Sequence, residues 1–238
     1  MDTIVVYIEN ENEHIHLLES LNILNIKSHR LFEGGKWTTH FNKLQIYVDG
    51  LKEINNEWVL LSDSRDVLFY KDMDEINRIY DKYYSNYDIV IQAETFSHGC
   101  IFFRETDLKR YEFNDTDYRW ICSGLIIGKR LEIIKWFEDV IKNVPPKWDI
   151  ADQPALEWGI KNLDGYKITL DSKCRLFQQT AGNNETDDGK TAGCGVNYHL
   201  HYNKNFIKNT LTDTEPCVFH AAGNAFLHQV WKIIHGRM

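Results

Sequence analysis

Proline is scarce in this chain of 238 residues, which contains only four. The sequence also has no internal repeat, no low-complexity tail and no linker rich in Ser and Pro. Nothing therefore marks a boundary between two domains. A chain of this length can bury one substantial hydrophobic core but is short for two. We expect a single domain over residues 1–238.

Paired cysteines are lacking as well. The five cysteines are odd in number and widely spaced, and no two of them form a Cys-x-x-Cys motif. A zinc ribbon or a disulfide framework therefore has no support. Free thiols are typical of a reducing compartment, so we expect a cytoplasmic-type location. The five residues are Cys100, Cys122, Cys174, Cys194 and Cys217.

Long apolar runs are also missing. The N-terminal segment carries a short apolar run at residues 4–8 that is followed by acidic residues. This run is too short for the apolar region of a signal peptide or for a membrane span, and no other stretch approaches the necessary length. We expect no signal peptide, no transmembrane segment and no membrane partner.

Positive charge is in deficit. Lys and Arg number 27 against 35 Asp and Glu, which gives a formal net charge of -8. Such a field repels phosphate backbones, and no basic run offsets it locally, so the balance argues against a nucleic-acid partner. An acidic balance is ordinary for an enzyme, and a local cluster of carboxylates could hold a metal ion.

What the sequence does contain is an alternation of apolar runs of strand length with amphipathic runs of helix length. This pattern predicts an α/β fold in which helices cover a sheet. The expected strands are 3–8, 58–61, 89–93 and 120–128, and the expected helices are 14–24, 40–54, 73–84 and 131–144. Residues 180–195 are rich in Gly, Asn, Asp and Thr without apolar periodicity, which predicts a loop.

Two carboxylates follow the buried strand 58–61. Asp63 and Asp66 lie three residues apart, where ligands bind at the carboxyl edge of an open α/β sheet. Their hard oxygen atoms suit Mg²⁺ or Mn²⁺, which would neutralise a diphosphate leaving group. The plainer alternative is that both aspartates only shape a turn after the strand.

A histidine ends a second short apolar run. His220 follows the run 216–219 and precedes small residues, among them Gly223 and Asn224. Neutral imidazole suits Mn²⁺ better than Mg²⁺ or Ca²⁺, although a single His after a strand is more often a structural residue. The histidine gains weight as a metal ligand only together with the two aspartates.

The segment 149–154 contains two aspartates before a helical run at 155–160. Asp152 is placed to cap that helix, and Pro154 suits its first turn. Capping accounts for Asp152 but leaves Asp149 and Gln153 unexplained. Carboxylates here could face an acceptor hydroxyl as base or orienting group. The alternative is that Asp149 and Gln153 are polar residues on the protein surface.

A glycine pair precedes the helical run 40–54. Gly34 and Gly35, followed by Lys43 on the helix, form a weak signal for phosphate binding. The motifs GxGxxG, GxxxxGK[ST] and GxSxG are all absent, which disfavours dinucleotide binding, a P-loop and a serine-hydrolase triad.

In their order along the chain, these segments resemble the glycosyltransferase domain of the procollagen lysyl hydroxylases and the related collagen glycosyltransferases of large DNA viruses. The resemblance covers nearly the whole chain and implies a GT-A fold, a Rossmann-like mixed sheet flanked by helices. A viral member would act in the host cytoplasm. The matching segments are 34–43, LSDSRDVLF at 61–69, IVIQAETF at 89–96, ICSGLIIG at 121–128, DIADQP at 149–154, ITLDSKCRLFQ at 168–178 and FHAAGN at 219–224.

The resemblance implies roles for individual residues. The metal, Mn²⁺ or alternatively Mg²⁺, would be bound by Asp63, Asp66 and His220. The catalytic candidates are Asp152, Asp149 and Gln153, and the candidates on the acceptor side are Glu94 and Trp148. The candidates for binding the UDP-sugar are Lys43, Gly34, Gly35, Asp63, Arg65, Ser123, Gly124, Gly223 and Asn224.

The sequence departs from the family pattern at several positions. Arg65 stands where the family usually has an aromatic residue between the metal-binding aspartates, and its guanidinium could stack on the base or reach a phosphate. Ala151 replaces the first acid of the family's DDQ motif, which leaves Asp149 as a second acidic candidate. Cys122 replaces an Asn before Ser123.

These observations predict a metal-dependent transferase that moves glucose or galactose from UDP-glucose or UDP-galactose to a hydroxyl acceptor. The resemblance suggests that the acceptor is hydroxylysine or galactosyl-hydroxylysine on a collagen-like polypeptide, or another glycan. A metal-dependent nucleotide-sugar hydrolase would use the same ligands to activate water. A glucosyltransferase for hydroxymethylated nucleic-acid bases and a binding module without activity are further alternatives.

Overall fold

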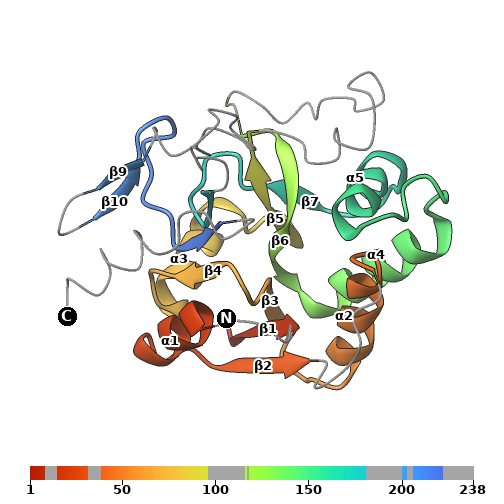
Figure 1. Ribbon diagram of the computed structural model, residues 1–238, viewed down its shortest axis with the longest axis horizontal. Helices are drawn as coiled ribbons and strands as arrows, with labels where there is room; N and C mark the ends of the chain where they lie inside the picture. The colour runs from red at the N-terminus through yellow and green to blue at the C-terminus, as the bar shows by residue number, and fades with distance from the viewer. Residues whose placement is uncertain are drawn as a thin grey trace, which may run out of the picture.

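A computed structural model of the protein describes residues 1–8, 15–31, 39–95, 116, 118–180, 200–202 and 206–221. A six-stranded sheet in the order β2-β1-β3-β6-β5-β7 forms its centre (Figure 1). The strands of this sheet are β1 (Thr3–Ile8), β2 (Ser28–Leu31), β3 (Trp58–Ser62), β5 (Ile89–Glu94), β6 (Trp120–Lys129) and β7 (Ile168–Leu170).

The sheet is mixed because one strand runs against the others. β1 pairs parallel with β2 and β3, and β5 pairs parallel with β7, whereas β6 is antiparallel to both β3 and β5. The carboxyl ends of β1, β3, β5 and β7 therefore share one edge with the start of β6. The register of β5 against β6 shifts between Ile91 and Gln92 at this edge.

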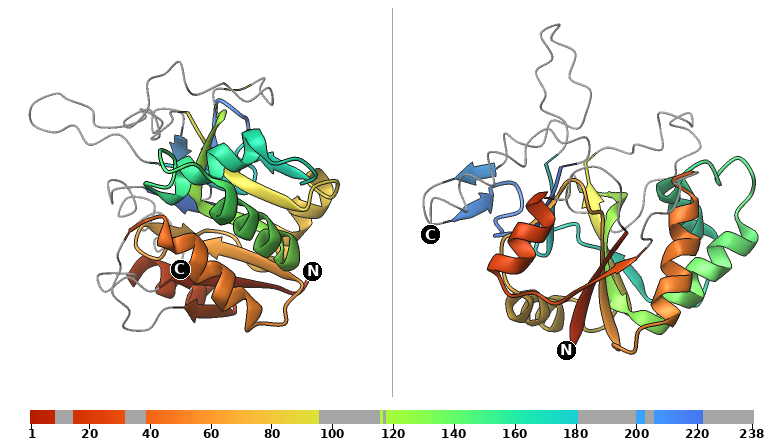
Figure 2. Two further views of the ribbon diagram at one scale, coloured as in Figure 1. Left: turned by 90° about the vertical axis from the view of Figure 1, so that its right-hand side faces the viewer. Right: turned by 60° about the horizontal axis from the view of Figure 1, so that its bottom comes forward.

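Helices cover both faces of the sheet (Figure 2, right). On one face, α2 (Asn42–Lys52), α4 (Arg130–Asn143) and α5 (Asp152–Asn162) bury apolar side chains such as Leu44, Trp136 and Leu156. On the other face, α1 (Ile15–Ile23) and α3 (Met73–Tyr83) bury residues such as Leu17 and Ile76. Burial of these two apolar layers is the main favourable contribution to folding.

Short strands add a second layer beside the central sheet. β4 (Val67–Phe69) pairs antiparallel with β11 (Val218–His220), and β11 pairs parallel with β8 (Phe177–Gln179). β9 (Leu200–Tyr202) and β10 (Ile207–Asn209) form a separate two-stranded sheet. The register of β4 and β11 places His220 opposite Val67, beside Asp66.

The α/β prediction is confirmed, and the predicted strands and helices all occur with boundaries shifted by a few residues. One local prediction is wrong. Asp152 does not cap the following helix, because α5 begins at Asp152, Ala151 is its N-cap, and no side chain makes the capping hydrogen bond. The Asp152 carboxylate instead pairs with Lys43. The predicted loop at 180–195 lies, beyond Thr180, outside the described residues.

Across the ranges that the structure describes, no helix combines the length and apolarity needed to span a bilayer.

Candidate active site

Asp63 and Asp66 lie where the chain crosses from the central sheet to the second layer. β3 ends at Ser62, and the next four residues turn the chain before β4 begins at Val67. Two backbone hydrogen bonds fix the ends of this turn: Asp63 N donates to Gly124 O at 2.8 Å, and Ala221 N donates to Asp66 O at 2.8 Å. These bonds fix the backbone that carries both carboxylates.

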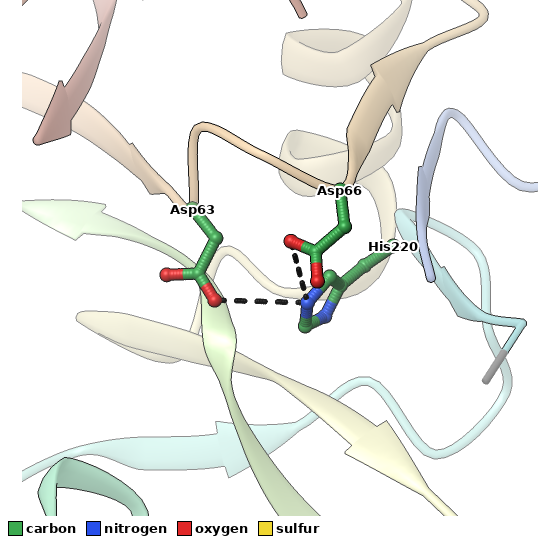
Figure 3. Close-up of side chains that lie close together, drawn as sticks. All are labelled: Asp63, Asp66 and His220. Atoms are coloured by element: carbon green, nitrogen blue, oxygen red, sulfur yellow. Dashed lines mark ion pairs between the residues drawn. The ribbon is translucent and has the colours of Figure 1, made fainter. Parts of the chain in front are cut away.

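His220 completes a cluster of three potential metal ligands (Figure 3). Its Nε2 lies 3.6 Å from Asp63 Oδ2 and 3.5 Å from Asp66 Oδ1. One ligand atom from each residue falls within 4.8 Å of the others. The imidazole is buried, whereas the two carboxylates are partly exposed. The cluster therefore opens outward on its carboxylate side.

The cluster fits a divalent cation on the evidence of one buried atom. His220 Nε2 has no hydrogen-bond partner among the described residues, although it faces two carboxylates. Two ligand atoms bound at about 2.1 Å to one ion lie up to about 4 Å apart. The distances from His220 Nε2 to the Asp63 and Asp66 oxygens, 3.6 and 3.5 Å, fall within this limit. Two carboxylate oxygens and one imidazole nitrogen are a ligand set for a divalent cation.

The other side of the His220 ring is closely packed. Its Nδ1 lies 2.8 Å from Gln92 Oε1 and 3.4 Å from Cys122 Sγ. A Cβ atom added to Gly124 would lie 2.1 Å from His220 Cε1, so only glycine leaves room for the ring. Burial alone would lower the pKa of the imidazole, but Cys122 and the Asp66 carboxylate raise it well above its ordinary value. Burial raises the pKa of the Cys122 thiol.

Lys43 connects the cluster of Asp63, Asp66 and His220 to the start of α5. Its buried ammonium donates to Asp63 Oδ1 and lies 3.0 Å from Asp152 Oδ2. Burial favours the neutral amine, but the two carboxylates raise the pKa of Lys43 well above its ordinary value. Burial also raises the pKa of the Asp63 carboxyl, and the positive charge of Lys43 offsets only part of this increase. Burial raises the pKa of the Asp152 carboxyl, but the ammonium of Lys43 lowers it by more, so the pKa lies below its usual range.

Glu94 is held by two amides at the end of β5. Gln153 Nε2 donates to Glu94 Oε1 at 2.8 Å, and Gln179 Nε2 donates to Glu94 Oε2 at 3.3 Å. Gln153 Oε1 also accepts from Ser123 N at 3.4 Å. These bonds fix the orientation of a fully buried carboxylate and join α5 to β5, β6 and β8.

Two adjoining clefts open onto the cluster. One, of about 280 Å³, lies over the C-terminal ends of β1 and β3, and the other, of about 350 Å³, lies over β5, β6 and α5. They share His40, Asp63, Asp66, Ser123 and Asp152. The first also contains Lys43, Tyr47 and Arg65, and the second contains Glu94, Gln153, Gln179 and His220. A ligand with two chemically different ends could therefore lie across the cluster.

Some predicted site residues lie elsewhere. Asp149 is exposed and Trp148 is buried, and neither is among the residues lining the two clefts. The placement does not support Asp149 as a substitute for the acid missing at Ala151, because the side chain of Ala151 itself lines the second cleft. Gly34, Gly35, Gly223 and Asn224 lie outside the described residues.

Sequence reasoning missed several residues at the site. Gln92 and Gln179 are fully buried polar side chains in strands, and Tyr47 lines the first cleft while its hydroxyl donates to Ser62 O at 3.0 Å. A signal for Gln92 existed, because an amide inside the otherwise apolar run IVIQA needs a buried partner. Nothing in the sequence indicated which partner that would be.

The comparisons with known proteins agree with this architecture. The model of the family described as "PLOD GT domain" matches residues 15–230. An uncharacterised protein, R699, of Acanthamoeba polyphaga mimivirus is 26% identical over 204 residues. That match covers 81% of this chain and 39% of the relative, so the chain spans well under half of the viral protein.

Two solved structures are similar to this chain at low sequence identity. A glycosyltransferase involved in glycosylating the major capsid of PBCV-1 matches over 99% of both chains, with a TM-score of 0.52 and 12% identity. Mouse xyloside xylosyltransferase 1 matches 93% of this chain and 85% of its own, with a TM-score of 0.47 and 12% identity. The first of these supports assignment of the mixed sheet and its helices to the GT-A fold.

Proposed function

Because this chain belongs to the PLOD GT domain family, we propose that it transfers glucose or galactose from a UDP-sugar to a hydroxyl acceptor in a metal-dependent reaction. The acceptor that this family suggests is hydroxylysine or galactosyl-hydroxylysine on a collagen-like polypeptide. The observation that carries the proposal is the cluster of Asp63, Asp66 and His220 at the junction of two clefts.

The three residues of the cluster would hold Mn²⁺, with Mg²⁺ as the alternative. A bound divalent ion supplies charge neutralisation at the diphosphate oxygens when the nucleotide leaves. The protein contributes a fixed turn at the two aspartates and a histidine ring packed against Gly124. Such preorganisation limits the reorganisation needed when the donor binds.

The first cleft suits the nucleotide end of the donor. Lys43 keeps its positive charge at neutral pH because two carboxylates raise its pKa, and it lies beside the metal cluster. Arg65 is exposed at the same cleft, where its guanidinium could contact a phosphate or stack on the base. We assign the nucleotide and diphosphate to this side.

The second cleft suits the sugar and the acceptor. Asp152 has a lowered pKa and stays ionised at neutral pH, so it can accept a hydrogen bond from a hydroxyl group. Glu94 presents a second carboxylate that Gln153 and Gln179 hold in place. We assign Asp152 to the acceptor hydroxyl, and Gln153, Glu94, Ser123 and Gly124 to the positioning of the sugar and acceptor.

The test is release of UDP from a panel of UDP-sugars with Mn²⁺, with and without a hydroxylysine peptide. We expect turnover that requires both the metal and an acceptor, and that falls at least 100-fold in Asp66→Ala and His220→Ala. Asp74→Ala and His201→Ala are matched controls, because both residues are exposed and lie outside the clefts.

Other outcomes separate the alternatives. UDP release that ignores every acceptor would favour a nucleotide-sugar hydrolase. Acceptor activity on hydroxymethylated bases alone would replace the collagen-like acceptor. If UDP-sugars bind but are not consumed, the chain is a binding module, and if none binds, the proposed donor is wrong.

A further inference from the structure

Gln92 contacts His220, one of the three residues of the proposed metal site. It lies in β5, directly after the shift in register against β6, and it is fully buried. Its Oε1 lies 2.8 Å from His220 Nδ1, across 128 positions of the sequence. Its Nε2 has no hydrogen-bond partner among the described residues. The amide oxygen therefore faces the ring. Among the described residues, this contact is the one hydrogen bond of the Gln92 side chain.

Metal binding requires a neutral ring, and in that state the orientation of the Gln92 amide determines which nitrogen of His220 carries the hydrogen. An amide oxygen only accepts hydrogen bonds, so Nδ1 must donate to it. A neutral ring that carries its hydrogen on Nδ1 has a lone pair on Nε2, the atom that faces Asp63 and Asp66. A lone pair facing two carboxylates is unfavourable unless a cation lies between them. The tautomer imposed by Gln92 is therefore the one that a metal ion requires.

We propose that Gln92 is a positioning residue, which holds His220 in the Nδ1–H tautomer and so presents Nε2 as a metal ligand. This inference rests on the proposed metal site and goes beyond it, because it assigns the residue that orients one of the ligands. Metal-bound histidines generally donate their second N–H to an oxygen acceptor of this kind.

Cys122 is the other group close to Nδ1, and it is the weaker candidate. Its Sγ lies 3.4 Å from Nδ1, and sulfur is a weak hydrogen-bond acceptor. Cys122 is directly opposite Gln92 in the pairing of β5 with β6, so the two side chains enclose Nδ1 together, with the amide as the main acceptor.

The experiment compares Mn²⁺ affinity, measured by titration calorimetry, in the wild type, Gln92→Met and Gln92→Glu. Met keeps the length of the side chain and removes the acceptor, so we expect affinity to fall about 10- to 100-fold. Glu restores an oxygen acceptor, so we expect affinity within about fivefold of the wild type. Gln178→Met is the matched control, because Gln178 is equally buried but bonds to Tyr118 and Asn209 and does not line the clefts.

A second measurement reads the tautomer without any metal. Nitrogen-15 NMR of the imidazoles, recorded where the ring is neutral and assigned with His220→Ala, should place the hydrogen on Nδ1 in the wild type and on Nε2 in Gln92→Met. Unchanged Mn²⁺ affinity in a folded Gln92→Met protein, or an Nε2–H tautomer in the wild type, overturns the proposal. If the wild type binds no Mn²⁺, the proposed metal-dependent function fails, and the NMR result alone decides the role of Gln92.

Discussion

The backbone of Gly124 lies directly against the imidazole of His220. An ideal Cβ placed on Gly124 would approach His220 Cε1 to 2.1 Å, Nδ1 to 2.5 Å and Nε2 to 2.8 Å. The same glycine accepts a hydrogen bond from Asp63 N through its carbonyl oxygen. Gly124 therefore positions two residues of the proposed metal site at once: Asp63 through its backbone carbonyl and His220 through the absence of a side chain.

We expect Gly124→Ala to impair metal binding more than folding. The methyl group cannot share space with the ring, so His220 must move away from Asp63 and Asp66. A displacement of about 1 Å is large for a metal ligand, and we expect Mn²⁺ affinity to fall at least about 10-fold. Titration calorimetry with Mn²⁺ and thermal unfolding of the metal-free protein measure the two effects separately.

Gly159→Ala is the matched control for this prediction. A Cβ on Gly159 would lie 2.5 Å from Val140 Cγ2, in the packing of α5 against α4 and outside both clefts. This variant should lower the melting temperature and leave Mn²⁺ affinity within about twofold, because overpacking costs about 1–3 kcal/mol. Equal Mn²⁺ affinity in Gly124→Ala and the wild type would contradict the role given to Gly124.

The sequence predicted those parts of the site that follow from the residue pattern within one short segment. Strand 58–61 and the two aspartates after it were recognisable because a short apolar run followed by carboxylates indicates the carboxyl edge of a sheet. His220 at the end of β11 was recognisable in the same way. The resemblance to a known family was needed to group the three residues.

Contacts between distant segments were not predictable. Asp152 was expected to cap its own helix, but it pairs with Lys43 from α2, and a single sequence carries no signal for such a pair. Gln92 in β5 meets His220 in β11 although 128 positions of the sequence separate them. The antiparallel direction of β6 was likewise unspecified, since buried strands in parallel and antiparallel positions have similar apolar sequences.

Removal of the Lys43 charge should weaken donor binding and alter the pH dependence of activity. In Lys43→Met, Asp63 and Asp152 lose the cation that lies between them. Burial raises the pKa of the Asp152 carboxyl, and the variant lacks the ammonium that lowers it, so this pKa should rise. Because the role proposed for Asp152 requires its ionised carboxylate, the acidic limb of the kcat/KM profile should move to higher pH. We also expect KM for the UDP-sugar to rise about 10-fold or more.

Lys52→Met provides the comparison. Lys52 belongs to the same helix and pairs with Glu138 at a half-exposed position. Its loss should leave both KM and the pH profile unchanged, because exposed ion pairs contribute little. If the acidic limb of Lys43→Met coincides with that of the wild type, Asp152 is not the group that titrates in the reaction.

Asp171 should be essential for stability and not for metal binding. Its buried carboxylate accepts from Arg175 N at 2.9 Å, from Leu176 N and Phe177 N at 2.7 Å each, and from the Tyr84 hydroxyl. Asp171→Ala leaves these donors without their acceptor, and we expect the free energy of unfolding to fall by about 3 kcal/mol or more. Denaturant unfolding of this variant beside Asp49→Ala, an exposed helical site, measures the difference. A loss below about 1 kcal/mol would show that water replaces the carboxylate.

Metal binding should itself stabilise the fold, through the cluster alone. An ion that binds only the folded state at 100 times its Kd adds about 2.7 kcal/mol of stability. Mn²⁺ should therefore raise the melting temperature of the wild type, and a chelator should reverse the rise.

In Asp66→Asn the rise in melting temperature that Mn²⁺ causes should be much smaller, since an amide is a weaker ligand than a carboxylate for a hard cation. In His220→Gln the preference for Mn²⁺ over Mg²⁺ should also decline, because the imidazole nitrogen is the one ligand that favours Mn²⁺. Thermal unfolding with each ion and each variant distinguishes the two effects. A shift of equal size in Asp66→Asn and the wild type would place the ion elsewhere on the protein.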